Sequence, residues 1–313
     1  MINLFEMKGE YLSLAETQNI EQNSLLARQN VVGVAISHKV KNGKDTGDPS
    51  LTVYVESKLD KNLIGVDDLI PATIGGFKTD VVESGVIMAG SSLETTRRQR
   101  PVQGGLSVGH YQITAGTIAT CVKDISPAVG KTARYYILSN NHVLANTNDA
   151  RLGDPILQPG PYDGGLNPAD IVAKLARYVP INFTAGASNL VDAAIAEGDF
   201  NILNREINWI GYCNQTAVTS VGQIVQKCGR TTAHSTGKVQ AINGTVNVGY
   251  GGGRVARFVN QIITSDMSAG GDSGSLVLNM QNQAVGLLFA GSSAITIINP
   301  IAPVMSSLGI KFI

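Results

Sequence analysis

Residues 270–277 read GGDSGSLV, and the interpretation of the second half of the chain depends on this stretch. Glycines, an aspartate and a serine before an apolar run are typical of a tight turn that leads into a strand. The same residues also place a serine hydroxyl on a turn whose glycines allow unusual backbone angles. A serine becomes a nucleophile only when a neighbouring base takes its proton, so the chemical interpretation of Ser273 requires such a base elsewhere in the chain.

The composition indicates a turn-rich globular protein. The chain has 313 residues, of which 24 are Lys or Arg, 24 are Asp or Glu and 35 are glycine. This length is sufficient for one large core or two modest ones. Because the charges balance, no net field attracts nucleic acid or an anionic membrane, and a single tryptophan, Trp209, offers little surface for base stacking. We therefore expect no nucleic-acid partner and no membrane partner.

The N-terminus and the cysteines predict a cytoplasmic protein. MINLFEMKGEYLSLAETQ contains acidic residues where a signal peptide needs a basic patch and an unbroken apolar run. No window has the apolar length needed to span a bilayer. Cys121, Cys213 and Cys228 are odd in number and widely spaced, which fits neither a disulfide framework nor a zinc site. We expect three free, buried thiols.

Residues 1–95 predict a small α/β domain. Residues 10–30 are helix-prone, and the apolar side chains available for one face are Leu12, Leu14, Ile20, Leu25 and Leu26. Strands are expected over residues 31–40, 50–59 and 77–85, and a short helix over residues 61–74. The basic, Pro- and Gly-containing run at residues 96–104 indicates a linker.

From residue 105 onward, short apolar runs alternate with Gly, Asn, Asp and Pro, which predicts antiparallel barrels or sandwiches. Only residues 301–312 suggest a helix, one that could dock on the outside of the barrels. Residues 154–170, DPILQPGPYDGGLNPAD, form an unusually long loop, and such loops are often binding or lid elements. Their aspartates lack the alternating spacing of a calcium loop, so we predict no metal and no cofactor.

His142 is the best candidate for the base that would activate Ser273. It follows the strand-like segment YYILSNN, so it lies at the mouth of a strand. Of the other three histidines, His38 lies in the N-terminal unit, His110 near the start of a barrel and His234 in a polar turn. A lone histidine is more often structural or solvent-facing than catalytic. The best residue to orient it is Asp192 in NLVDAAIAEG, because a carboxylate in a small apolar segment can be buried. Taken alone, Asp192 could equally begin or cap a strand.

Several motifs occur together in the order His142, Asp192, Ser273. YILSNNHVLAN resembles the histidine motif of trypsin-like, chymotrypsin-fold serine peptidases. VDAAIA is similar to their aspartate motif and GGDSGSLV to their GDSG nucleophile motif, while CGRTTAHSTGKV resembles the hairpin that opens the second barrel in bacterial members. The resemblance covers residues 103–313, and with the N-terminal unit it extends to the intracellular bacterial group related to the plant Narrow Leaf 1 protein.

This resemblance implies a mainly β fold of two antiparallel six-stranded barrels after a small α/β domain. The first barrel would span residues 105–208 and carry His142 and Asp192, and the second would span residues 209–313 and carry Ser273. The cysteines that staple the histidine loop in secreted members are missing here, which is consistent with a reducing compartment.

The resemblance also implies an activity and roles for individual residues. His142 would act as general base and then acid, Asp192 would accept its Nδ1–H, and Ser273 would form an acyl-enzyme with a protein or peptide substrate. The N–H groups of Gly271 and Ser273 would form the oxyanion hole, and Gly274 would let substrate approach closely. Asp272 would anchor the loop against a partner that the sequence does not identify.

The sequence motifs that bear on the specificity pocket and on activation are weaker than those of the three candidate catalytic residues. The position six residues before Ser273, which holds an aspartate in trypsin-like enzymes that cleave after Lys or Arg, holds Met267 here, beside Asp266. The resemblance implies that Phe289, Ala290 and Gly291 form the strand that pairs with substrate and walls a mostly apolar pocket. RRQRPVQGG resembles an activation site, but Pro101 follows Arg100 directly, so a linker is the better interpretation.

Three functions remain in competition at this point. The first is a serine endopeptidase, and the second is a catalytically silent, protease-shaped scaffold whose N-terminal domain binds partners or mediates homo-oligomers. The third is an esterase or other acyl hydrolase that uses the same triad. An α/β-hydrolase is disfavoured, because its nucleophile motif would read G-x-S-x-G and its histidine would come last.

Overall fold

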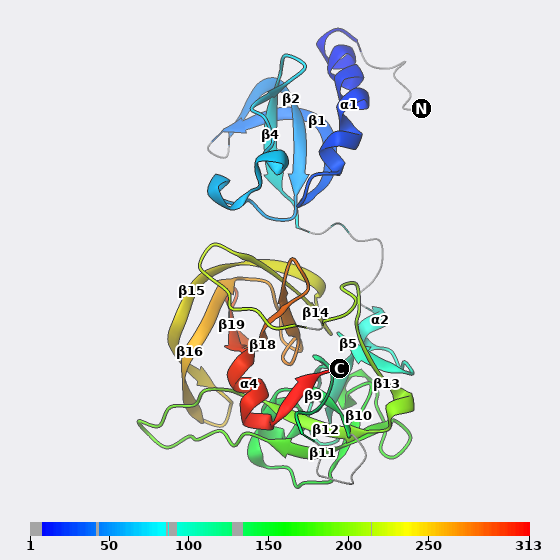
Figure 1. Cartoon of the computed structure of the whole chain (residues 1–313), viewed down its shortest axis with the longest axis vertical. Helices are drawn as coiled ribbons and strands as arrows, with labels where there is room; N and C mark the ends of the chain where they lie inside the picture. The colour runs from blue at the N-terminus through cyan, green and yellow to red at the C-terminus, as the bar shows by residue number, and fades with distance from the viewer. Residues whose placement is uncertain (1–7, 42–43, 86, 88–92, 127–133, 214) are drawn as a thin grey trace. The chain divides into compact units, whose positions relative to one another are not determined.

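The structure is a computed structural model, and it describes residues 8–41, 44–85, 87, 93–126, 134–213 and 215–313 (Figure 1). The chain divides into two compact units, residues 1–89 and residues 90–313. Within the described residues, no helix combines the length and apolarity that crossing a membrane requires. Residues 1–7, which contribute to the signal-peptide expectation, lie outside the described residues.

The N-terminal unit is a four-stranded mixed sheet with one helix packed on it. The helix is α1 (Glu10–Leu26), and the strands are β1 (Val31–Lys41), β2 (Lys44–Val55), β3 (Thr73–Ile74) and β4 (Phe77–Glu83). The strand order is β1-β2-β4-β3, with β2 and β4 parallel and the other pairs antiparallel. Leu14 and Leu25 of α1 pack with Leu51, Val53 and Val55 of β2 to form its core.

Two expectations for this unit are wrong. Ile20 and Leu26 are 76% and 46% exposed, so they do not share the buried face with Leu14. Ile20 lies six positions after Leu14, which at 3.6 residues per turn puts it about 120° around the helix from Leu14. Residues 61–74 form two 3-10 turns, Lys61–Leu63 and Val66–Asp68, followed by β3 rather than a helix. Gly65 and Pro71 interrupt the helical pattern.

The second unit begins with an antiparallel, barrel-like sheet. Its strands are β6 (Ser107–His110), β7 (Gly116–Thr117), β8 (Thr120–Asp124), β9 (Tyr135–Ser139), β10 (Pro155–Leu157), β11 (Ile171–Tyr178), β12 (Ala194–Gly198) and β20 (Ile310–Phe312). The order is β20-β8-β9-β12-β11-β10-β6-β7. Two further strands, β5 (Val102–Gly104) and β13 (Leu203–Ile207), pair in parallel. The short helices are α2 (Leu93–Thr96), α3 (Asn141–Leu144) and the 3-10 turns Asn146–Asn148, Pro161–Asp163 and Phe200–Ile202.

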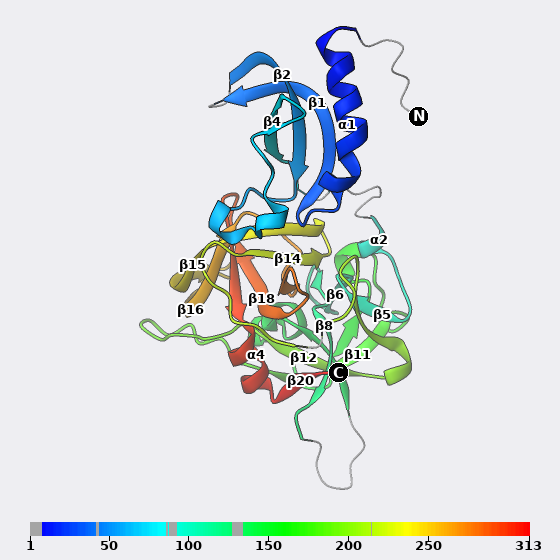
Figure 2. The same cartoon turned by 45° about the horizontal axis from the view of Figure 1, so that its top comes forward.

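The remaining strands of this unit close into an antiparallel six-stranded barrel (Figures 1 and 2). Its strands are β14 (Ile224–Gly229), β15 (Ala233–Gly249), β16 (Val255–Ser265), β17 (Leu276–Asn279), β18 (Ala284–Gly291) and β19 (Ile295–Pro300). The order around the barrel is β14-β15-β16-β19-β18-β17. β15 and β16 form the long hairpin that carries the chain from residue 233 to residue 265.

The mainly β fold with two barrel-like parts and a small α/β unit is therefore confirmed, with one difference. The first part is an eight-stranded sheet rather than a six-stranded barrel, and its two end strands are the C-terminal strand β20, which pairs with β8, and the short strand β7, which pairs with β6. The expected C-terminal helix is α4 (Ile301–Leu308), and it leads directly into β20. One apolar cluster joins both parts, since Val304 and Ile310 pack with Leu138 and Leu287. The expected domain boundary at residue 208 stays a prediction.

The expected linker, residues 96–104, makes specific contacts within the second unit. Arg98 Nε lies 2.8 Å from Asp170 Oδ1, and Arg100 Nη2 donates to the Gln158 carbonyl at 3.1 Å. Val102 in β5 is fully buried. These contacts give the basic residues of RRQRP structural partners.

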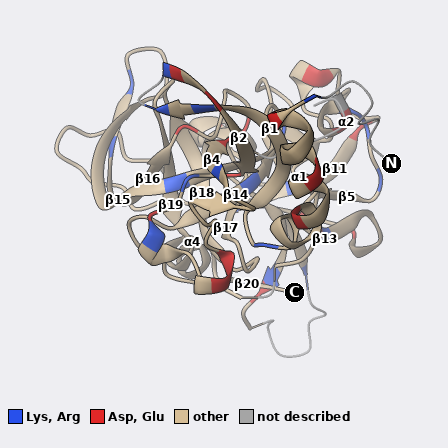
Figure 3. Cartoon of the chain, turned by 90° about the horizontal axis from the view of Figure 1, so that it is seen from above, with Lys and Arg blue, Asp and Glu red and all other residues tan. Residues whose placement is uncertain are grey.

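The three cysteines are free and buried, as expected. Burial raises the pKa of the Cys121 and Cys228 thiols to about 12, so both remain neutral at physiological pH. Figure 3 shows positively and negatively charged segments interspersed along the chain, in keeping with its 24 cationic and 24 anionic residues.

We expect a chain that begins at residue 90 to fold, and a chain that begins at residue 105 to be less stable. The shorter chain loses the buried Val102 side chain, the pairing of β5 with β13 and the Arg98 and Arg100 contacts. Burial of one valine alone contributes about 1.5–3 kcal/mol. Guanidinium unfolding followed by circular dichroism measures the difference, and equal midpoints would contradict the expectation.

Candidate active site

The end of β9 positions His142. The strand stops at Ser139, and after the extended residue Asn140 the short helix α3 turns His142 outward, with 23% of its side chain exposed. Asn140 is buried and its Nδ2 donates to the Asp192 carbonyl at 2.7 Å. The backbone between β9 and α3 is therefore tied to the segment that carries Asp192.

Asp192 lies just before β12, and its side chain is fully buried. Its Oδ2 is 2.6 Å from His142 Nδ1, and its Oδ1 accepts the His142 backbone N–H at 3.2 Å. Its own backbone N–H donates to Asn299 Oδ1 at 2.9 Å, and Asn299 Nδ2 donates to Gln261 Oε1 at 2.7 Å. Donors and acceptors from both barrel-like parts thus hold the carboxylate against the imidazole.

The other histidines lie in different surroundings. His38 pairs with Asp45 in the N-terminal unit, and His234 Nε2 lies 2.9 Å from Gln226 Oε1. His110 is 3.1 Å from Asp154, but its side chain is fully buried and therefore inaccessible to a substrate. Of the four, His142 combines a buried aspartate partner with an exposed ring edge.

Ser273 is placed between the glycine turn and β17. Its Oγ donates to the Phe289 carbonyl at 3.4 Å, and its own carbonyl accepts the Thr117 N–H at 2.7 Å. In this arrangement the hydroxyl bonds to the backbone of β18 rather than to His142. Catalytic hydrogen bonds are often formed only in the substrate complex, so this geometry is compatible with Ser273 as the candidate nucleophile.

Gly274 lies close against the first sheet. A Cβ at this position would lie 2.1 Å from Ser139 Oγ and 2.3 Å from the Thr117 carbonyl. Glycine is therefore required for the approach between the serine turn and the first sheet, and its expected role toward substrate stays a prediction. Because Ser139 is the last residue of β9, this contact brings Ser273 next to the strand that presents His142.

The backbone of the serine turn is held in one orientation by two threonines. Asp272 N–H donates to the Ala269 carbonyl at 3.0 Å, and Gly271 has φ +99°, as expected at the third position of a type II turn. Thr231 Oγ1 donates to the Gly270 carbonyl at 2.7 Å, and Thr117 Oγ1 donates to the Gly271 carbonyl at 2.8 Å. In a trans peptide the C=O and N–H point in opposite directions, so the Gly271 N–H faces away from Thr231.

The structure identifies Lys227 of β14 as the partner of Asp272. Both side chains are fully buried, and Lys227 Nζ lies 3.1 Å from Asp272 Oδ2. The carboxylate also accepts the N–H groups of Thr231, Thr232 and Ala269, at 2.8, 3.1 and 2.9 Å. Burial alone would raise the pKa of Asp272, but the Lys227 ammonium and these hydrogen bonds outweigh it and lower the pKa.

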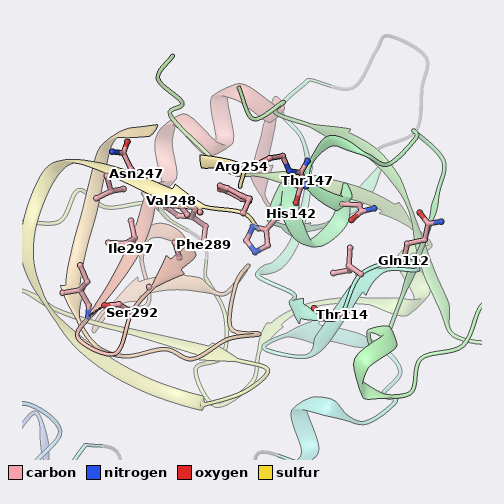
Figure 4. A pocket seen from close by; sticks show the side chains of 18 residues that line it. Gln112, Thr114, His142, Thr147, Asn247, Val248, Arg254, Phe289, Ser292 and Ile297 are labelled. Atoms are coloured by element: carbon pink, nitrogen blue, oxygen red, sulfur yellow. Dashed lines mark hydrogen bonds between the residues drawn. The ribbon is translucent and has the colours of Figure 1, made fainter. Parts of the chain in front are cut away.

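A cavity of about 760 Å³ opens beside His142. Figure 4 shows the His142 ring between Val248 and Phe289 on one side and Thr147 on the other. Ala290 and Gly291 also line this cavity. The cavity lining does not include the other two residues expected at the pocket. Met267 is packed in the core of the closed barrel, and Asp266 is exposed, with its Oδ1 accepting the Ser268 N–H at 3.4 Å.

The long loop at residues 154–170 supports the serine turn instead of forming a lid. Asp163 forms a two-pronged ion pair with Arg230, which also stacks on Tyr162 with its guanidinium carbon 5.0 Å from the ring centroid. Arg230 directly precedes Thr231, which holds the Gly270 carbonyl. No cluster of three or more possible metal ligands occurs among the residues that the structure describes.

Sequence reasoning missed Lys227, Thr231 and Asn299. Thr231 belongs to the CGRTTAHSTGKV motif, and Lys227 immediately precedes that motif, so proximity to a recognisable pattern was the available signal. Asn299 lies on β19 and carries no sequence signal, because an asparagine in a strand has many possible partners.

No family model and no curated protein match the sequence. The fold is similar to that of protease A from Thermobifida fusca, with 17% identity and a TM-score of 0.48 over 67% of this chain and 97% of that chain. It is also similar to the chymotrypsin of Cellulomonas bogoriensis, with 19% identity and a TM-score of 0.47 over 68% and 98% of the two chains. The Nocardiopsis protease has 20% identity and a TM-score of 0.48 over 67% and 97%. These structures are chymotrypsin-fold serine proteases, and at such low identity the likeness concerns the fold alone.

We expect Lys227→Met to lower the free energy of unfolding by about 3–5 kcal/mol at neutral pH, because it leaves Asp272 buried without its cation. The Asp272 pKa is lowered in the folded protein, so the stability that this group contributes is present above its unfolded pKa and is lost as pH falls through the folded value. The loss caused by the variant should therefore shrink in acid.

Urea unfolding at several pH values measures this effect. The exposed lysine of β11 provides a matched control in Lys174→Met, which should change stability little. Adding Asp272→Asn to Lys227→Met should restore part of the loss. A single-variant loss below 1 kcal/mol would contradict the assigned role of the ion pair.

Proposed function

We propose that the protein is a serine endopeptidase that cleaves peptide bonds through an acyl-enzyme. The observation that carries this proposal is the 2.6 Å contact between His142 Nδ1 and the fully buried Asp192 carboxylate, at the edge of a cavity. A buried carboxylate on Nδ1 leaves Nε2 of His142 as the proton acceptor. Ser273 is the nucleophile in this proposal.

The proposed reaction begins when the Ser273 hydroxyl leaves the Phe289 carbonyl and donates to His142 Nε2. Ser273 Oγ then attacks the scissile carbonyl, and its proton passes to His142. The N–H groups of Gly271 and Ser273 stabilise the oxyanion, while Asp192 stabilises the imidazolium. His142 returns the proton to the leaving amine, and water releases the acyl group by the same steps in reverse.

The orientation of the serine turn supports catalytic activity without prior proteolytic activation of the chain. Lys227 supplies Asp272 with a buried ammonium from within β14, so a newly freed N-terminal ammonium is not needed to order the turn. The Thr231 bond to the Gly270 carbonyl turns the Gly271 N–H toward the proposed oxyanion hole. The proposed enzyme is therefore active as synthesised, and its substrate is a protein or peptide.

A catalytically silent scaffold is the second candidate, and one observation favours it. The Ser273 hydroxyl is hydrogen-bonded to the Phe289 carbonyl, not to His142. A protein in which this bond persists would bind peptides along β18 without cleaving them. Hydrolysis of esters by the same triad is the third candidate, because the acyl chemistry is shared.

We further propose that the protein is related to the intracellular bacterial group that resembles the plant Narrow Leaf 1 protein. In this proposal the protein is cytoplasmic, and the N-terminal unit, residues 1–89, mediates self-association or binds partners rather than supplying chemistry. Its edge strand β1 has eleven residues and pairs with no strand other than β2 among the described residues, which suits pairing with another chain.

We expect a fluorophosphonate probe to label the wild-type protein and to leave Ser273→Ala unlabelled. Labelling of His142→Ala should fall by several orders of magnitude, and hydrolysis of a peptide should follow the same order. The double variant should be scarcely worse than either single variant, because the triad acts as a unit. Labelling of a wild type that hydrolyses only esters would favour the third candidate, and an unlabelled, folded wild type would favour the scaffold.

We expect Thr231→Val to lower kcat by about 10- to 100-fold with little change in KM. The substitution keeps the side-chain shape but removes the donor that orients the Gly270–Gly271 peptide, and loss of one oxyanion donor typically costs about 10²- to 10³-fold. Thr236→Val on β15 is the matched control. Equal steady-state parameters for Thr231→Val and wild type would show that this threonine does not orient the turn.

A further inference from the structure

The Asp192 carboxylate receives a third donor, which neither the sequence motifs nor the proposed mechanism uses. The Tyr250 hydroxyl donates to Asp192 Oδ2 at 2.8 Å, the same oxygen that lies 2.6 Å from His142 Nδ1. One carboxylate oxygen therefore bonds to both the imidazole and the phenol. Since Asp192 is fully buried, no water competes for this oxygen from bulk solvent.

The β15–β16 hairpin presents Tyr250 in this position. Tyr250 directly follows β15, and its N–H donates to the Arg254 carbonyl at 2.9 Å across the hairpin turn. The turn consists of Gly251, Gly252 and Gly253, all with φ between 58° and 76°. Residues other than glycine rarely adopt these backbone angles, so the turn directly after Tyr250 requires its three glycines.

Aromatic neighbours hold the Tyr250 ring so that its hydroxyl reaches Asp192. The ring packs edge-on against Phe183, with centroids 5.5 Å apart, and edge-on against His142 at 5.9 Å. It also lies 6.2 Å from the ring of Phe258. Phe183 precedes Asp192 in the same connection between β11 and β12, so the aromatic packing ties the hairpin to the aspartate segment.

Tyr250 acts as a donor over the whole neutral range. Burial, followed by the charge of Asp192 and its hydrogen bond, raises the pKa of Tyr250 well above its ordinary value. The phenol therefore keeps its proton wherever a histidine can serve as a base. It can only donate to the ionised carboxylate, because that carboxylate has no proton of its own to give.

We propose that Tyr250 is a positioning residue of the catalytic site, which orients Asp192 and sets how strongly its charge acts on His142. This inference rests on the proposed function. With the phenol in place, Asp192 Oδ2 accepts two hydrogen bonds and part of its charge is compensated. Without the phenol, the carboxylate keeps only its two contacts with His142, and its less compensated charge favours the protonated imidazole.

Few other charges face this group. His142 comes from α3 and Asp192 from the segment before β12, and the hairpin itself contributes Arg254. Arg254 Nη1 lies 3.5 Å from Asp149 Oδ2, and both side chains are largely exposed, so solvent screens their effect on Asp192. The dominant change on removal of the phenol is therefore local to Asp192.

Tyr250→Phe tests the proposal, because it keeps the aromatic packing and removes the hydroxyl. The readout is the rate constant for inactivation by diisopropyl fluorophosphate, measured from pH 5 to 9 on the full chain. We expect the plateau rate to fall about 10- to 150-fold, the range for loss of one hydrogen bond to a charged group. The acid limb of the profile should move to higher pH by about half a unit or more.

Tyr136→Phe is the matched control. Tyr136 in β9 donates to Asp124 Oδ2 at 2.9 Å, so the variant loses the same kind of phenol–carboxylate bond at a carboxylate that belongs to no proposed catalytic group. It should lose stability but keep the wild-type pH profile. A purely structural role for Tyr250 would make the two variants behave alike, with lower stability and an unmoved acid limb, and would overturn the proposal.

A second measurement does not depend on activity. The proton on His142 Nδ1, in its 2.6 Å contact with Asp192, should give a low-field resonance in one-dimensional proton NMR that is lost in His142→Ala. Tyr250→Phe should shift this resonance, and Tyr136→Phe should leave it in place. If the wild type reacts with no fluorophosphonate, the proposed function fails and the NMR comparison alone decides the role of Tyr250. An unmoved resonance together with an unmoved pH profile would refute it.

Discussion

Burial of the Asp192 carboxylate is the constraint on which the candidate site depends. A charged group without access to water is stable only when donors surround it, and here these donors are His142 from the first sheet and Tyr250 from the hairpin of the second barrel. Asn299 of β19 accepts the Asp192 backbone N–H. The groups come from segments far apart in the chain, so the carboxylate is satisfied only when both barrel-like parts have assembled. The same bonds that satisfy Asp192 also align His142.

The serine turn follows the same principle with a second buried carboxylate. Asp272 is satisfied by the Lys227 ammonium and by backbone N–H groups on both sides of the turn, and this pairing holds the residue next to Ser273 in place. Gly274 then allows the turn to approach the end of β9 closely. Two buried anions, each with its own set of donors, therefore locate the proposed nucleophile, Ser273, and the proposed base, His142, relative to one another.

Much of this arrangement could be predicted from local sequence. The strands of the second unit follow from short apolar runs between turn residues, and the GDSG turn, the segment around His142 and the apolar segment around Asp192 each carry a recognisable pattern. The expectations that were wrong concern packing. Ile20 is apolar but faces away from the core, because the side of an element that is buried depends on what lies against it. Met267 packs in the barrel core and residues 96–104 contact residues 158 and 170 far along the chain, which local sequence does not reveal, and their expected roles as pocket residue and linker stay predictions.

The sequence by itself determined the mainly β architecture, the order of the three candidate catalytic residues and the need for glycine in the serine turn, since these depend on local periodicity and backbone freedom. Only the tertiary structure decided which residues are the hydrogen-bond and ion-pair partners of Asp192 and Asp272. Lys227 reaches Asp272 across 45 residues, Tyr250 reaches Asp192 across 58 and Asn299 reaches Asp192 across 107. No local pattern encodes such pairs, because a lysine, a tyrosine or an asparagine can meet any of many hydrogen-bond partners. The choice is made when burial leaves each carboxylate with only the donors that the packed barrels bring to it.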